Sequence, residues 1–525
     1  MIVETICENA YRQRSELDLN HQMVRPSTKQ TWLQLSLLIG TSLYLYVQLF
    51  AFPDIPFLVQ GDQNFFWVYA LRTLRGEWPY RDFFQFTPPG TDLFFATLFK
   101  LLGPQIWVMN FAVLILGVAF SLLCFQLANR FMKQSMALLA TLLCLVLIYS
   151  DRLDATHHWF SLLAVLFAVR ILMPERTASR VAIAGTLLGI GSFFTQTTGV
   201  AGLVAILASL AWERFSAQKP WRTILKQQIL LVLAFSIMWS TLGAPFIVAA
   251  GWKHFWYLLV TYPKNYVFYK HDFLFPGLAV PTTWHALPEP AYRLFIYILM
   301  VAVSPLVLLD FWRKRRLSPH GMQLVLLSMM GLFLFLEIAT RMNWNRVYAV
   351  ATPAMILFVW LVDRTRKLRP YAIATLWTIL VCVAAMQTRS RQHRILAVLD
   401  LPAGKAALSL EEFEEFSWLK QHTKPGDPFF QGSWLNVYAP LNLHSPVFVD
   451  GLWPSDRTRP EDVSLTIQQV EQARLKYILW IPRWATPEAS DPPQGDHLGP
   501  FRVYLTSHYV RVHVFLNTDE VWERQ

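Results

Sequence analysis

The residues best suited to chemistry lie in a polar stretch that follows the first long apolar segment. Asp62 stands between Gly61 and Gln63, and the pair Arg81-Asp82 follows in the same stretch. Ionisable groups beside a membrane-length apolar segment are costly unless they serve a function. Asp62 is therefore a candidate proton acceptor for a hydroxyl nucleophile. The alternative is that it caps the helix that its aromatic neighbours predict.

Arg81 and Asp82 have two interpretations. Asp82 is a second candidate catalytic acid, and the guanidinium of Arg81 can bind a phosphate through two hydrogen bonds. Alternatively, the two side chains form a local ion pair on a solvated loop, which contributes little to stability. Tyr80, the aromatic residue before them, is a candidate for contact with an acceptor.

A second polar group, residues 151–158, contains two aspartates and two histidines. Asp154, His157 and His158 are expected to line a polar cavity and to contact an acceptor. They could also bind a divalent metal, although their order along the chain matches no standard ligand spacing. No other cofactor is predicted.

Basic residues in two later connections are candidates for binding a phosphate. Arg341 and Arg346 lie between two apolar segments, where they could hold a lipid phosphate or contact lipid head groups in general. Lys264 lies in an aromatic-rich segment, residues 252–269, which is typical of the belt at a membrane surface. The lysine could also flank a cavity for a lipid phosphate and a sugar.

The composition indicates a polytopic membrane protein. The chain has 525 residues, of which 54% are hydrophobic and 15% charged, and its mean hydropathy is +0.33. Soluble domains carry about 25% charged residues, and apolar stretches of about 20 residues can cross a bilayer as helices. About eleven such helices are predicted, at residues 31–52, 106–129, 136–150, 156–173, 180–194, 197–213, 225–249, 290–311, 320–340, 345–362 and 370–387.

The basic residues predict the orientation in the membrane. Lysine and arginine clusters recur in alternate connections, as the positive-inside rule requires of the cytoplasmic side. Membrane topology thus explains the net charge of +11, and nucleic-acid binding is not predicted. With a cytoplasmic N-terminus, the polar candidates and the C-terminal part lie outside an inner or plasma membrane.

The chain is expected to fold as three regions. Residues 1–30 form a cytoplasmic tail, residues 31–387 a transmembrane catalytic domain, and residues 388–525 a small extracytoplasmic α/β domain. The first outer loop, residues 53–105, is expected to contain interfacial helices. In the C-terminal domain a capping-box sequence begins at Ser409, but no catalytic group is predicted. None of the four cysteines lies there, so neither a disulfide framework nor a zinc motif is expected.

The first loop also resembles a known family. Gly61-Asp62-Gln63, then Leu74-Arg75-Gly76-Glu77-Trp78-Pro79-Tyr80, then Thr87-Pro88-Pro89-Gly90 resembles the integral-membrane GT-C glycosyltransferases. The resemblance is greatest to the bacterial group related to protein O-mannosyltransferases and the lipid A aminoarabinose transferase. It implies a polyprenyl-phosphate-linked sugar donor, transfer on the extracytoplasmic face, and a first-loop acid beside the reacting groups. Asp62 matches that acid, whereas Gln63 replaces the second acid of the family's common Asp-Glu pair.

The implied reaction transfers a sugar, with inversion, to an acceptor hydroxyl of a glycan, lipid or protein. Asp62 takes the hydroxyl proton, and the arginines named above stabilise the departing polyprenyl phosphate. Asp82 and His158 are further candidates for positioning the acceptor or contacting a metal. Two other classes of protein stay open. A transporter or flippase of lipid-linked sugars should show repeated halves and midplane charges, and the second alternative is a non-catalytic membrane scaffold.

Overall fold

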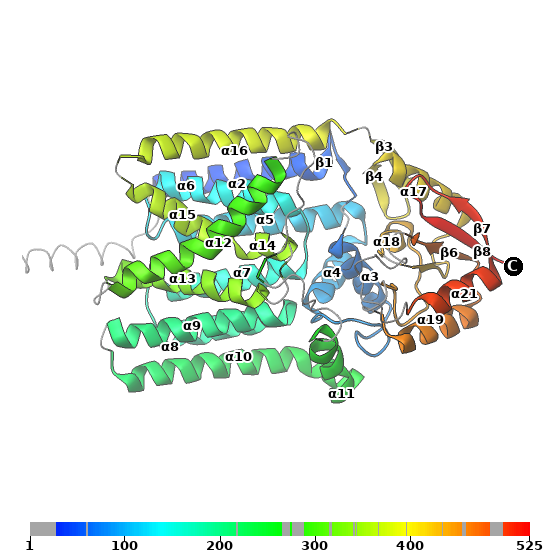
Figure 1. Cartoon of the computed structure of the whole chain (residues 1–525), viewed down its shortest axis with the longest axis horizontal. Helices are drawn as coiled ribbons and strands as arrows, with labels where there is room; N and C mark the ends of the chain where they lie inside the picture. The colour runs from blue at the N-terminus through cyan, green and yellow to red at the C-terminus, as the bar shows by residue number, and fades with distance from the viewer. Residues whose placement is uncertain are drawn as a thin grey trace, which may run out of the picture.

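The protein is a bundle of long helices with a smaller mixed domain at one end. The computed structural model describes residues 28–58, 61–216, 219–264, 274–275, 288–313, 318–339, 342, 344–365, 367–394, 396–432, 434–453, 458–482 and 497–525. Figure 1 shows the long helices side by side and the C-terminal strands at the far end, with two helices of the first loop between them.

Among the described residues, eight helices are long and apolar enough to cross a membrane. They are α2 (Thr28–Leu49), α5 (Ile106–Ala128), α6 (Gln134–Leu143) continued by η2 (Cys144–Tyr149) and η3 (Ser150–Arg152), α9 (Gln196–Ser216), α10 (Trp221–Ala250), α12 (Pro288–Arg313), α13 (Pro319–Ile338) and α16 (Arg369–Gln392). Two apolar helices are shorter, α7 (His157–Leu172) and α8 (Ala178–Phe194). The polytopic helical class is confirmed, while the total of eleven spans stays a prediction.

The segment expected as one span at residues 345–362 consists of two helices. These are α14 (Trp344–Val350) and α15 (Thr352–Arg364), which are separated at Ala351. Pro353 lies in the first turn of α15, where a missing N–H costs nothing, and it prevents the two helices from continuing as one. The short α14, which carries Arg346, lies toward the end of the bundle that faces the C-terminal domain (Figure 1).

Small residues let α8 lie directly against α10. A Cβ added at Gly185 would lie 2.5 Å from the carbonyl oxygen of Leu231, and one added at Gly189 would lie 2.8 Å from that of Phe235. Both distances are shorter than van der Waals contact, so a larger residue would push the helices apart. In lipid, helices associate through such close packing because the hydrophobic effect does not drive them together.

The first loop folds into a short hairpin and two helices. Strands β1 (Phe50–Ala51) and β2 (Ile55–Pro56) pair antiparallel, and α3 (Asp62–Leu74) and α4 (Gly90–Leu102) follow. Aromatic residues of α3, such as Phe66 and Trp67, are almost fully buried. The two helices pack between the bundle and the C-terminal domain (Figure 1).

The C-terminal domain combines a hairpin, a mixed sheet and helices. Its elements are β3 (Ala397–Leu401), β4 (Gly404–Leu408), α17 (Leu410–His422), β5 (Phe430–Gln431), α18 (Tyr438–Leu441), α19 (Pro460–Ala473), β6 (Tyr477–Trp480), α21 (Gly499–His508), β7 (Tyr509–Val514) and β8 (Glu520–Arg524). The sheet has the order β5-β6-β8-β7, with only β5 and β6 parallel. The predicted capping box is present, because Ser409 and Glu412 exchange side-chain and backbone hydrogen bonds.

Backbone hydrogen bonds join the C-terminal domain to the transmembrane part. The N–H of Phe84 donates to the carbonyl of Phe448 at 2.7 Å, and the N–H of Ile106 donates to the carbonyl of Ala403 at 2.9 Å. These bonds link residues that lie far apart in the sequence. The domain is therefore fixed against the first loop, and the space between them has a defined wall.

The contact between α8 and α10 is open to a direct test. We expect Gly185→Ala to destabilise the protein by about 1–3 kcal/mol, because the added methyl group overpacks a tight helix contact. Gly243→Ala in α10 is the matched control, because no atom lies within 4 Å of a Cβ added there. Thermal unfolding of the purified protein in detergent measures both. Equal melting temperatures for the two variants would contradict the prediction.

Candidate active site

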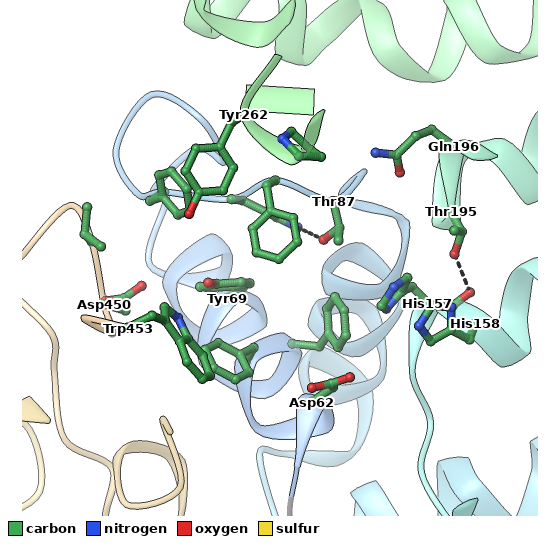
Figure 2. A pocket seen from close by; sticks show the side chains of 18 of the residues that line it. Asp62, Tyr69, Thr87, His157, His158, Thr195, Gln196, Tyr262, Asp450 and Trp453 are labelled. Atoms are coloured by element: carbon green, nitrogen blue, oxygen red, sulfur yellow. Dashed lines mark hydrogen bonds between the residues drawn. The ribbon is translucent and has the colours of Figure 1, made fainter. Parts of the chain in front are cut away.

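A cavity of about 220 Å³ lies where the helical bundle, the first loop and the C-terminal domain meet. Its wall draws on α3, on the segment that precedes α4, on the starts of α7 and α9, on α14 and on the C-terminal domain. The polar residues of the wall include Asp62, His157, His158, Thr197, Arg346 and Asp450. Figure 2 shows Asp62 between the two histidines on one side and Asp450 with Trp453 on the other.

Asp62 is the first residue of α3, and the N-cap position belongs to Gly61. Gly61 has φ 101° and ψ −148°, a conformation that residues with a side chain rarely adopt. The glycine turns the chain into α3, and Asp62 lines the cavity without capping the helix. A helix N-terminus carries a partial positive charge, which favours an anionic side chain in the first turn.

Gln63 does not line the cavity and instead fixes the second polar loop. Its Oε1 accepts a hydrogen bond of 2.5 Å from the backbone N–H of Ala155, and its side chain is buried. The residue next to Asp62 thus holds the loop that carries Asp154. A glutamine makes this contact without bringing a further negative charge to the site.

Asp154 interacts electrostatically with Asp62 but lies outside the cavity wall. Burial raises the pKa of Asp154 to about 7, and the charge on Asp62 contributes to the rise. Thr156 Oγ1 donates a hydrogen bond of 3.0 Å to Asp154 Oδ1. At neutral pH a large fraction of Asp154 is therefore protonated, and Asp62 is not opposed by a second full negative charge.

The bundle side of the cavity carries two histidines and an arginine. The rings of His157 and His158 lie 3.9 Å apart, and Phe66 packs against His157 with 5.2 Å between ring centroids. Arg346 lines the same side from α14. This part of the wall can bind an anion, because a guanidinium and imidazole N–H groups are hydrogen-bond donors.

Glu337 of α13 supports this side of the cavity, and its role was not predicted from the sequence. Its carboxylate accepts a hydrogen bond from Thr197 Oγ1, and it lies within electrostatic reach of Arg346. Glu337, Arg346 and His158 also line a small adjoining space. An acid inside an apolar span is costly unless it is paired. The presence of Glu337 within the apolar span that ends at Ile338 could therefore have marked it as a functional residue.

Arg81 and Asp82 lie outside the cavity wall. Arg81 Nη2 and Asp82 Oδ2 are 2.7 Å apart in a partly exposed ion pair, and the N–H of Trp78 donates to the same carboxylate at 2.8 Å. The hydrogen bonds from Arg81 lower the pKa of Asp82. The structure thus shows the local ion pair that was the alternative interpretation of these two residues.

The remaining predicted residues also lie off the wall. Tyr80 is fully buried and donates a hydrogen bond of 2.6 Å to the carbonyl of Thr87, so it supports a lining residue from behind. Lys264 is exposed and follows Pro263, which does line the cavity. Arg341 lies outside the described residues.

The C-terminal domain contributes lining residues that were not predicted. Asp450, Trp453, Thr458 and Asp462 all face the cavity. Asp450 is held by Arg72 of α3, whose Nη1 lies 2.6 Å from Asp450 Oδ1. No local sequence pattern predicts this contact, because Arg72 and Asp450 are hundreds of positions apart.

The structure offers no clustered set of metal ligands in the part of the chain that it describes. No group of three or more His, Cys, Asp or Glu side chains there is close enough to hold an ion. Asp154, His157 and His158 therefore do not form such a group, although they lie near one another.

The fold and the cavity define the class of the protein. It is an integral membrane protein with a polar cavity between its first loop, its helical bundle and a trailing α/β domain. Residues 87–239 match the family described as dolichyl-phosphate-mannose-protein mannosyltransferase. No curated protein matches the chain significantly.

Solved structures share the whole architecture. ArnT from Cupriavidus metallidurans, bound to undecaprenyl phosphate, is 11% identical, with a TM-score of 0.57 over 94% of this chain and 98% of that one. The Archaeoglobus fulgidus oligosaccharyltransferase AglB, bound to an inhibitory peptide and a dolichol-phosphate, is 12% identical. Its TM-score is 0.51 over 86% of this chain and 70% of that one. The predicted resemblance is confirmed: the chain has the GT-C fold of these structures, and residues 87–239 resemble the protein O-mannosyltransferase family.

The raised pKa of Asp154 predicts a pH-dependent stability. The folded protein holds the Asp154 proton more tightly than the unfolded chain does, so stability falls as the pH rises from about 4 to about 7. Asp154→Asn removes this loss and keeps the acceptor oxygen for Thr156. We expect the melting temperature of Asp154→Asn, relative to wild type, to be higher at pH 8 than at pH 5. Thermal unfolding at both values measures it.

Asp82→Asn is the matched control for this prediction. The pKa of Asp82 is lowered, so that the sign is opposite and its contribution to stability is lost only at acid pH. The difference between this variant and wild type should therefore be the same at pH 5 and pH 8. A pH-independent difference for Asp154→Asn would show that Asp154 is ionised throughout this range.

Proposed function

We propose that the protein transfers a sugar from a polyprenyl-phosphate-linked donor to an acceptor hydroxyl, with Asp62 as general base. The observation that carries the proposal is that one cavity holds both Asp62 and Arg346. The first can accept a proton and the second can bind a phosphate. The similar structures of ArnT and AglB, which hold undecaprenyl phosphate and a dolichol-phosphate, support a lipid phosphate as the leaving group.

The reaction needs one carboxylate. The acceptor oxygen forms a bond to the sugar C1 while its proton passes to Asp62, and the bond between C1 and the phosphate oxygen breaks. The lipid phosphate leaves with the electron pair and already carries negative charge, so it needs no strong acid to protonate it. A single displacement of this kind inverts the configuration at C1, in contrast to the two-step mechanism of retaining glycosidases.

Positive charge at the bundle side would stabilise the leaving group. Of the residues predicted to bind the donor phosphate, we propose Arg346, which lines the cavity on the same wall as His158. Glu337 and Thr197 position this side of the cavity, since Thr197 donates a hydrogen bond to Glu337 near Arg346. Fixed charges that face the point where charge develops lower the barrier, because they need not reorganise during the reaction.

The topology of the proposal follows the distribution of basic residues. The cavity and the C-terminal domain would face the outside of an inner or plasma membrane, and the loops rich in arginine and lysine would face the cytoplasm. Four predicted residues are not assigned to the reaction, because none of them lines the cavity: Tyr80, Arg81, Asp82 and Lys264.

The central test is donor turnover by Asp62→Asn. We expect the variant to lose activity by about 10²–10⁴-fold, because an amide cannot accept the hydroxyl proton. Release of undecaprenyl phosphate from an undecaprenyl-phosphate-linked sugar in proteoliposomes measures the activity. Asp82→Asn, which changes an acid of the same loop outside the cavity, should retain it. Full activity in a folded Asp62→Asn protein would remove the proposed base.

The same assay separates catalysis from the other two classes. A flippase or transporter would move the labelled lipid across the bilayer without releasing the lipid phosphate, and a scaffold would do neither. Wild-type protein that leaves every undecaprenyl-phosphate sugar intact, with each acceptor class present, would contradict the enzymatic proposal.

Arg346 should govern the affinity for the donor. We expect Arg346→Ala to raise the KM for the lipid-linked sugar by about 10-fold or more, because a charge-assisted bond to phosphate is lost. Arg81→Ala is the control, because Arg81 lies outside the cavity wall and pairs with Asp82. If a divalent metal held the phosphate in place of Arg346, EDTA would abolish turnover and Arg346→Ala would leave the KM unchanged.

A further inference from the structure

The C-terminal domain gives the cavity an aromatic wall that differs from the cationic wall of the bundle. Trp453 stacks on Phe65 of α3, with 5.7 Å between ring centroids and an angle of 25°. Tyr69, one turn along α3, lines the same region. Trp434 packs edge-on against Trp453 at 5.4 Å but does not line the cavity, so it supports the wall from behind.

Two hydrogen bonds with Thr458 hold the backbone of Trp453. Thr458 Oγ1 accepts a hydrogen bond of 2.8 Å from the N–H of Trp453 and donates one of 2.9 Å to its carbonyl. Thr458 itself lines the cavity. The indole is thus held in place before any ligand binds, which reduces the entropic cost of binding.

A buried carboxylate oxygen lies beside this aromatic wall. Asp450 is 2% exposed, and its Oδ1 accepts a hydrogen bond of 2.6 Å from Arg72 Nη1. The Ser445 side chain also interacts with this carboxylate, but Oδ2 has no partner at hydrogen-bond geometry among the described residues, and Asp450 lines the cavity. A buried carboxylate oxygen without a donor is costly, so the position suits a ligand that donates a hydrogen bond.

The chemistry of this wall points to a sugar ring. An aromatic face can cover the apolar face of the ring, and a carboxylate can accept hydrogen bonds from its hydroxyl groups. The arginines on this side, Arg72 and Arg459, are already paired with Asp450 and Asp462, so they leave no free positive charge for a phosphate. A lipid chain would leave the Asp450 oxygen without a donor.

We propose that Asp450 and Trp453 form the acceptor subsite and that the acceptor is a saccharide. This inference rests on the proposed function, because it places the donor phosphate at Arg346. In Figure 2 Asp62 lies between the histidines and Trp453, and in this proposal it takes the proton of a hydroxyl of the saccharide bound on Trp453. The C-terminal domain then selects the acceptor, and the bundle selects the donor.

Binding measurements on the full-length protein in nanodiscs test the inference without turnover. The probes are neutral trisaccharides of glucose, mannose and N-acetylglucosamine, and a hexapeptide that contains Ser and Thr, each followed by saturation-transfer NMR. We expect at least one trisaccharide to bind. Trp453→Leu should weaken its binding about 10-fold, because the stacking face is lost.

Matched variants separate this role from a structural one. Trp434→Leu changes the same aromatic cluster behind the wall and should leave the saccharide affinity within about twofold of wild type. Undecaprenyl phosphate should bind Trp453→Leu as tightly as it binds wild type. Binding of the peptide in place of the trisaccharides, no binding of any trisaccharide, or an equal effect of Trp434→Leu would each overturn the inference.

The outcome is distinguishable from failure of the proposed function. Asp82→Asn, which changes an acid outside the cavity wall, should bind the saccharide as tightly as wild type. If trisaccharide binding depends on Trp453 while donor turnover is absent, then the subsite stands and the proposed reaction fails. If turnover occurs but Trp453→Leu raises the KM for the donor, then the acceptor subsite is wrong.

Discussion

The guanidinium of Arg72 is the constraint on which the rest of the site depends. It is 4% exposed, and it donates to Asp450 Oδ1, to the carbonyl of Val447 and to Glu77, and it lies over the ring of Phe83 at 4.9 Å. Burial alone would lower the pKa of Arg72, but the charges of Asp450 and Glu77 more than compensate and raise it. A buried charge that loses one partner costs about 3–5 kcal/mol, so α3 and the C-terminal domain must keep this contact.

This one ion pair decides which residues can face each other across the cavity. Arg72 lies on the same helix as Asp62, and Asp450 lies in the loop that leads to Trp453. When the pair forms, the base at the start of α3 and the aromatic wall of the C-terminal domain are brought to one space. The backbone bond between Phe84 and Phe448 adds a second attachment beside it. The domain therefore acts as a fixed wall of the cavity.

Local patterns were enough to predict much of the fold. Apolar periodicity located the long helices, and the capping-box residue Ser409 marked the start of α17. Asp62 was found because an acid follows an apolar span and its flanking residues resemble a known first loop. Arg81 and Asp82 also carry residue types suited to catalysis and phosphate binding, and yet they pair with each other. Spacing alone does not reveal such a pair, and the contributions of Glu337 and Asp450 depend on contacts across the fold.

Gln63, in place of the expected second acid, keeps a further negative charge away from Asp62 and Asp154. Asp154 already provides a carboxyl group near Asp62, and burial, with a smaller contribution from the charge of Asp62, raises its pKa to about 7. A glutamate at position 63 would have to accept the N–H of Ala155 as an anion and would add a third charge. The neutral amide makes the same hydrogen bond to the loop. The absence of a further negative charge also favours binding of the anionic phosphate that we propose as the leaving group, because fewer fixed negative charges repel it.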